Sequence, residues 1–230
     1  MREWDPPAQS APLPLPHRSP QMATQERAVR TRNTLIESAA ELFDRDGYDV
    51  ATLSTISARA GVSSGALHFH FTSKATLADA VGQAAALRLE VITRQEAGGA
   101  LQMLIDATHA LVWHLNHDVV LRAGFGLNDR LEHVRDGAGL RAKWQAWVEH
   151  AFVRADREGA LAPGPLARDA ATAVVAFTSG LGILGRQDAW WRSHAPLTRF
   201  WRLLLPALAE SSCLDALVAS GTKSLTPVAP

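Results

Sequence analysis

The chain has 230 residues, and its 23 basic and 23 acidic side chains give a formal net charge of zero. A hydrophobic fraction of 47% is that of a globular protein, and the neutral balance does not by itself indicate a nucleic-acid partner. The lone Cys213 excludes an intrachain disulfide and fits a reducing interior. The longest apolar run, residues 170–185, is shorter than the roughly 20 residues of a membrane span. We therefore expect a cytoplasmic protein without a membrane partner.

Prolines crowd residues 1–22 and no periodicity is visible there, which predicts a disordered tail and not a signal peptide. A helical pattern begins at Thr24 and stops at Gly47. Its apolar residues recur every three or four positions and are expected to face a core: Val29, Leu35, Ile36, Ala39, Ala40, Leu42 and Phe43.

Two short helices are predicted next, with a glycine turn between them. Thr52 is placed to cap a helix over 53–60, and Ser63 to cap a second over 64–69. Gly61 supplies the turn, and two short helices joined in this way are the layout of a DNA-binding helix-turn-helix. Residues 23–72 are therefore the candidate DNA-binding domain.

The rest of the chain shows no strand-like alternation and predicts an all-α protein. Ser73 is placed to cap a long helix from Lys74 towards Arg94, and residues from 220 onward are expected to form a frayed tail. Glycine and proline breaks separate the other expected helices, which cover residues 100–116, 119–127, 140–158, 166–186 and a last pair within 196–219.

Several segments resemble one family. Residues 61–74 read G-V-S-S-G-A-L-H-F-H-F-T-S-K, which is similar to the recognition segment of TetR-type repressors, and in particular of γ-butyrolactone autoregulator receptors. Residues 120–127, 175–180 and 200–206 resemble the L-x-R-A-G-x-R-L, S-F-T-G and M-W-R-x-x-L-P segments of that branch. The resemblance implies a TetR-like fold, with ligand-binding and dimerisation functions in residues 73–219. It also implies a homodimer on a pseudo-palindromic double-stranded operator, released by a small diffusible γ-butyrolactone, furan or butenolide.

Within this reading the start of the recognition helix lies over base edges in the major groove. Lys74 matches the family lysine that contacts the DNA backbone, and Thr52 caps a helix whose N-terminus suits a phosphate. Two positions depart from the branch: Ser64 replaces the usual lysine and His68 the usual tyrosine, so a different operator sequence is expected. The predicted DNA contacts are Arg27 and Arg30 on an extended arm with Arg32, Thr52, Ser63, Ser64, Gly65, His68, His70 and Lys74.

The predicted ligand contacts follow mainly from the resemblance. Trp144 matches the tryptophan that closes over the ligand in the family, and Trp147 shares its helix face. Thr178 is the polar candidate on the apolar helix, where a hydroxyl can orient a ligand carbonyl. Gln83 lies near a family glutamine but out of register.

The helix over 170–185 is apolar nearly all round, which requires burial on more than one side. It is expected to form the dimer interface together with Leu197, Phe200, Leu203, Leu204 and Leu208.

Alternative readings remain at this point. The protein could sense another metabolite such as an antibiotic, act as a carrier or enzyme without DNA binding, or carry a helix-turn-helix that no longer binds DNA. No nucleophile–base arrangement or phosphate loop supports an enzyme or a cofactor. His109, His114 and His117 are expected to be core or solvated histidines, because zinc sites use three or four convergent ligands.

Overall fold

The computed structural model describes residues 20–94, 98–131, 139–164 and 167–222. These residues form helices and contain no strand; one isolated bridge joins Leu161 and Ala209. The helices are α1 (Pro20–Arg45), α2 (Leu53–Ala60), α3 (Ser64–His70), α4 (Lys74–Thr93), α5 (Ala100–His117), α6 (Val119–Leu131), α7 (Leu140–Arg157), α8 (Ala167–Leu184), the 3-10 helix η2 (Ala189–Arg192), α9 (His194–Leu208) and α10 (Ser211–Leu214). None of the helices in these ranges combines the length and the hydropathy needed to cross a membrane.

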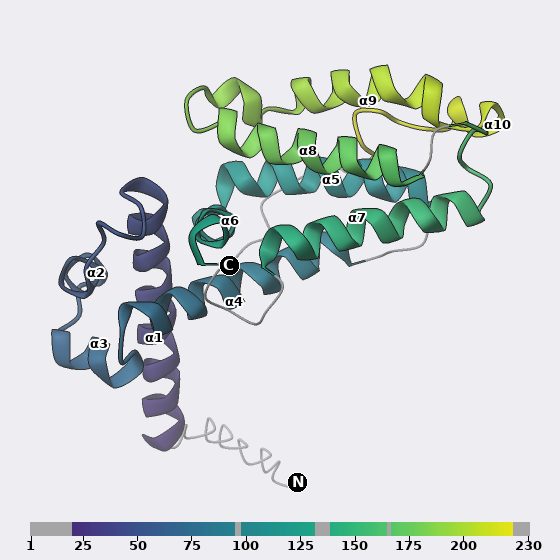
Figure 1. Ribbon diagram of the computed structural model, residues 1–230. Helices are drawn as coiled ribbons and strands as arrows, with labels where there is room; N and C mark the ends of the chain where they lie inside the picture. The colour runs from purple at the N-terminus through teal and green to yellow at the C-terminus, as the bar shows by residue number, and fades with distance from the viewer. Residues whose placement is uncertain (1–19, 95–97, 132–138, 165–166, 223–230) are drawn as a thin grey trace, which may run out of the picture.

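Helices α1–α3, here called the reading unit, stand at one end of the molecule, and α4 runs from them into the remaining helices (Figure 1). Helix α1 begins at Pro20, so the predicted tail over 1–22 ends earlier than expected, and residues 1–19 lie outside the described residues. The inward face of α1 is confirmed except at Val29, which is 59% exposed. Helices α6, α2 and α4 pack on α1, and its buried residues lie between Leu35 and Phe43.

The caps that define α2 and α3 form as predicted. The Thr52 hydroxyl accepts from the Thr55 amide at 3.1 Å, and the Ser63 hydroxyl accepts from the Ala66 amide at 3.2 Å. Gly61 ends α2 at φ 66°, a left-handed conformation that glycine adopts without steric cost. Side-chain caps on both helices and a glycine between them therefore fix the angle at which α3 leaves the unit.

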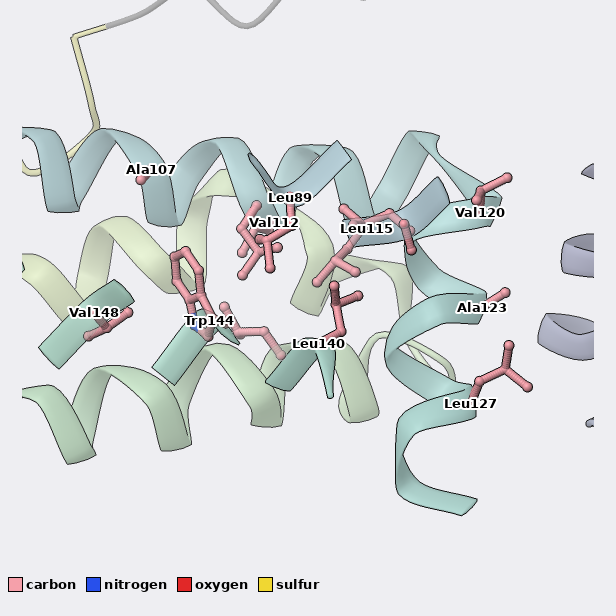
Figure 2. Packing of buried hydrophobic residues seen from close by; sticks show 14 of the residues in the cluster. Leu89, Ala107, Val112, Leu115, Val120, Ala123, Leu127, Leu140, Trp144 and Val148 are labelled. Carbon is pink, nitrogen blue, oxygen red and sulfur yellow. The ribbon is translucent and has the colours of Figure 1, made fainter. Parts of the chain in front are cut away.

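Helix α6 lies at the junction and makes its most extensive contacts with α4 and α1. Figure 2 shows Val120, Ala123 and Leu127 on the side of α6 that faces away from Trp144. A Cβ at Gly124 would collide with the Cβ of Ala85 on α4, so glycine is needed for this close helix approach. Motion of α6 is thereby tied to both α1 and α4.

Helices α5, α7, α8 and α9 form the larger bundle (Figure 1). Its largest buried side chains are Trp144 and Trp201, and the Trp201 indole donates to the Thr108 hydroxyl at 2.9 Å. The last predicted helix pair is present: α9 begins at His194, two residues before the expected start, and is followed by the short α10. The predicted tail also differs, because the Thr222 amide and hydroxyl donate to Asp106 at 2.8 and 2.6 Å; residues 223–230 lie outside the described residues.

Candidate functional site

The start of α3 presents small side chains to solvent. Ser63, Ser64 and Gly65 are exposed, and a Cβ on Gly65 would find only the Ser63 hydroxyl, at 3.9 Å. Leu67 is buried and anchors the opposite face of the helix. The residues predicted to meet base edges thus lie together on an exposed surface. Their side chains are so small that the α3 backbone itself is near that surface.

The end of α3 carries aromatic groups. His68 is exposed, His70 is half-buried, and the His70 ring stands edge-on to Phe69 at 5.2 Å between centroids. Phe69 is 82% exposed, although the sequence analysis did not single it out. The sequence did contain the relevant signal, which is a phenylalanine within the recognition segment. An aromatic side chain that faces solvent from such a helix suits contact with a thymine methyl or a sugar.

Lys74 is engaged within the protein. Its ammonium donates to the carbonyls of Tyr48 and Ala51 at 2.9 Å each and of Asp49 at 3.3 Å, and it lies 4.5 Å from the centre of the Tyr48 ring. These bonds use all three N–H donors of the ammonium. In this conformation Lys74 joins the start of α4 to the 48–51 loop and has no donor left for a phosphate.

The basic residues of α1 are placed differently from the prediction. Arg27 and Arg30 are exposed, but they lie within α1 and not on an extended arm, because the helix begins at Pro20. Arg32 lies over the Phe71 ring at 5.4 Å. Thr52 remains exposed while it caps α2, so the amides of that helix start stay near the surface.

A partly open cavity of about 80 Å³, here called the ligand chamber, is lined by residues of the larger bundle, of α6 and of the last turn of α1. Trp144 is 2% exposed, and its indole donates to the Thr178 hydroxyl at 3.1 Å. The structure thus brings together these two predicted residues, from α7 and α8, in one wall (Figure 2 shows Trp144 turned towards α5). The described lining comprises Asp44, Leu111, Leu115, Arg122, Phe125, Gly126, Arg141, Trp144, Thr178, Ser179, Gly182, Ile183, Arg186 and Arg192.

The other two predicted ligand residues are outside this lining. Trp147 stacks on Trp144 with centroids 5.3 Å apart, and its indole donates to the Thr93 carbonyl at 3.1 Å. Trp147 therefore packs against Trp144 without lining the chamber. Gln83 is exposed and borders a separate surface hollow of about 420 Å³ between α1 and α4.

The lining of the ligand chamber includes charged residues that sequence reasoning missed. Asp44, in the last turn of α1, accepts from Nε of Arg122 at 2.9 Å, and its main-chain carbonyl accepts from Arg186 at 2.9 Å. Arg141 and Arg192 line the same cavity. These four arginines, here called the chamber arginines, come from α6, α7, the segment after α8, and η2. Arg122 lies in a segment that the resemblance marked, but no local pattern links the others.

His109 is bonded on both ring nitrogens within the protein. His109 is 2% exposed; Nε2 donates to the Ala219 carbonyl at 3.0 Å, and Nδ1 lies 3.1 Å from Nδ1 of His194. Burial lowers the pKa of His109 and that of His114. Within the described residues, no three possible ligands gather into a metal site.

The outer faces of α8 and α9 expose apolar side chains. Leu203 is 82% exposed and Ile183 57%, and the rings of Phe177 and Phe200 stack 4.2 Å apart between the two helices. Of the predicted interface residues, Leu197 and Leu208 are instead buried in the protomer's own core. Fewer apolar side chains of α9 are therefore available for a dimer interface than the sequence indicated.

Comparisons with known proteins agree with this architecture. Residues 35–81 match the family of bacterial regulatory proteins called the tetR family. The A-factor receptor protein of Streptomyces griseus is 29% identical over 208 residues, which are 89% of this chain and 73% of the relative.

Two solved structures are similar over most of their length. The crystal structure of a γ-butyrolactone receptor (ArpA-like protein) has a TM-score of 0.72 at 26% identity, over 83% of this chain and 94% of that one. Full-length native TylP, a TetR regulator from Streptomyces fradiae, has a TM-score of 0.66 at 30% identity, over 84% and 93%. A helix-turn-helix at one end, a helical ligand domain at the other and these likenesses agree, and the chain belongs to the TetR family of regulatory proteins.

Proposed function

We propose that this protein is a transcriptional repressor that binds an operator as a homodimer and leaves it when a small molecule enters the ligand chamber. One observation carries the proposal: Asp44, in the last turn of α1, is both part of the reading unit and part of the chamber lining. A molecule in the chamber therefore acts on a helix of the DNA-binding domain without an intermediary.

DNA binding is assigned to the exposed start of α3. Ser63, Ser64 and Gly65 approach the base edges, with His68 and Phe69 one turn further along. Arg27 and Arg30 are positioned on the helix surface for the phosphates. Because so few cations contribute, operator affinity should depend moderately on salt concentration.

The signal is assigned to the γ-butyrolactone, furan or butenolide class. The sequence segments shared with butyrolactone receptors support this, as do the relatives that are themselves receptors. Trp144 offers a flat aromatic wall, and the Thr178 hydroxyl lies within it. A relative that answers to another metabolite remains the second candidate, and Arg192 favours it, since its buried Nε has no hydrogen-bond partner in the described residues.

Dimerisation is assigned to the outer faces of α8 and α9. Leu203, Phe200 and Phe177 form an apolar surface whose pairing across a two-fold axis would bury it. The two recognition helices would then meet successive major grooves about 34 Å apart. The chain acts without catalysis in this scheme, and its place of action is the cytoplasm, where the chromosome lies.

The test is fluorescence anisotropy on labelled duplexes taken from upstream of the protein's own gene, and on duplexes selected from a random library. Titrations at several salt concentrations, with and without organic culture extract, separate the candidates. Salt-dependent binding reversed by extract is expected. Binding that no extract reverses would point to another signal. Absence of any selected duplex would refute the repressor and favour a carrier that does not bind DNA.

A further inference from the structure

The surface hollow between α1 and α4 has an exposed apolar lining. On the α4 side it is lined by Leu87, which is 64% exposed, and by Val91, which is 55% exposed. Buried Ile36 lines it from α1. Its volume of about 420 Å³ is larger than that of the ligand chamber. Large aliphatic side chains that face solvent around a hollow indicate an interaction surface.

The first turns of α1 extend this apolar surface towards the start of the described chain. Met22 and Val29 are 52% and 59% exposed, and both line a second hollow on α1. Asn33 borders the two hollows, which therefore adjoin. Together they are here called the α1–α4 groove, which leads from the beginning of α1 to the side of α4.

The chain that precedes α1 has the composition to fill this groove. Residues 6–16 read P-P-A-Q-S-A-P-L-P-L-P and contain no charged side chain. Leucines that alternate with prolines favour the extended polyproline II conformation, which has no internal hydrogen bonds. Segments of this kind bind in surface grooves with little further loss of conformational freedom.

The lengths of the segment and of the groove match. Pro20 is the first residue of α1, and a proline there disfavours the helical conformation in the residue before it, so the chain can turn back at this point. At about 3.1 Å per residue, Leu15 and Leu13 reach about 16 and 22 Å from Pro20. At about 1.5 Å per helical residue, Val29 and Asn33 lie about 14 and 20 Å from Pro20. Leu15 can therefore reach Val29, and Leu13 the hollow beside α4.

We propose that residues 6–16 bind along the α1–α4 groove of their own chain, with Leu15 against Val29 and Leu13 against Leu87. The attachment at Pro20 makes the binding intramolecular, so a contact that would be weak between separate molecules is sufficient. The bound segment contacts α1 of the reading unit and α4 at once, and it restrains the angle between them. The inference goes beyond the proposed function and does not rest on it, because its test contains neither DNA nor ligand.

Disulfide formation tests the position of the segment in the full-length protein. Cys213→Ser removes the native thiol, and Leu13→Cys is combined with Gln83→Cys, at an exposed position on the border of the hollow. The control combines Leu13→Cys with Gln145→Cys, at an exposed position of α7. On non-reducing gels after mild oxidation, we expect the intrachain disulfide to Gln83→Cys to form at least about tenfold faster than that of the control. Equal rates, or disulfides between two chains only, would overturn the proposal.

A substitution within the groove tests the apolar contact in a chain that keeps its own cysteine. Leu87→Asp should release the segment, because the docked segment would desolvate the new carboxylate. Trypsin should then cleave after Arg18 at least about fivefold faster, as intact mass shows, because cleavage follows the population of the released form. Val50→Asp, at a position that is 69% exposed and outside both hollows, should leave the rate unchanged.

Circular dichroism confirms that the variants fold. If Leu87→Asp does not fold, Val91→Asp takes its place, since Val91 lines the same hollow and is also exposed. An unchanged cleavage rate in a folded groove variant would overturn the proposal, and so would an equal acceleration by Val50→Asp.

Discussion

At the start of α3 the residues assigned to function are small and exposed, whereas in the ligand chamber Trp144 and Thr178 are buried and bonded to each other. Gly65 touches almost nothing in the protein, and Trp144 is 2% exposed and donates to Thr178. A substitution on α3 should therefore change function while sparing the fold. A substitution in the chamber should change both, and matched variants are needed to separate the two effects.

The largest expected effect comes from a substitution at the exposed start of α3. Gly65→Glu should weaken operator binding by at least about 100-fold, because it places bulk and negative charge against DNA. The thermal midpoint should hardly change, since the new side chain has open space. Gly82→Glu on α4 is the control: a Cβ there meets no atom within 4 Å, and α4 is a different helix from α3. If Gly65→Glu bound as well as Gly82→Glu, α3 would not be the reading helix.

Trp144 provides the contrasting case in the chamber. Replacement by alanine would empty a buried indole site and cost about 3–5 kcal/mol of unfolding free energy, so loss of ligand response would be hard to interpret. Trp144→Phe should cost less, about 1–2 kcal/mol, because it keeps most of the apolar volume and removes the bond to Thr178.

Urea denaturation gives the stability of both Trp144 variants. The phenylalanine variant should retain operator binding and lose most of the response to the chamber ligand. Full response in that variant would show that the Trp144–Thr178 bond plays no part in sensing.

The junction between the two regions gives a test of packing. Gly124→Ala should destabilise the protein by about 1–3 kcal/mol, because the added Cβ collides with Ala85 on α4. Gly126→Ala, two residues along the same helix, meets no atom within 4 Å and should be neutral or stabilising by up to about 1 kcal/mol. Thermal denaturation compares them, and Ala85→Gly should restore stability to Gly124→Ala. Equal stability of both single variants would contradict the close approach of α4 and α6.

The smallest expected effect is on how the stability of the protein depends on pH. Burial lowers the pKa of His109, with His194 adding repulsion, while Asp106 and the Ala219 carbonyl act the other way. The unfolded chain takes up this proton at about pH 6.5, above the folded pKa, so stability should be full above that pH and decline as pH falls below it. His109→Gln should flatten this decline between pH 7 and 5, and exposed His150→Gln should not. An identical decline in both variants would assign it to other groups.

Local sequence was sufficient to predict those features of the structure that depend only on residues close together in the chain. The caps at Thr52, Ser63 and Ser73, the glycine turn at Gly61 and the apolar periodicity of α1 each act within a few residues, and the structure contains all of them. The same locality allowed the α3 surface to be assigned from one short segment, because every residue of a recognition helix comes from a single turn of chain.

Contacts between distant segments were not visible in the sequence. Lys74 was assigned to a phosphate, which stays a prediction, and the fold also brings three carbonyls of the 48–51 loop to its ammonium. Gln83 was near a family position, yet the rotation of α4 directs it towards α1.

Sequence alone thus determined the helical class and the capped helices of the reading unit. The bond between Trp144 and Thr178, the chamber arginines with their link to Asp44, and the close contact at Gly124 were decided by tertiary structure. The physical reason is that a charge or a glycine acquires its role from atoms up to 142 positions away along the chain, as Arg186 does from the Asp44 carbonyl.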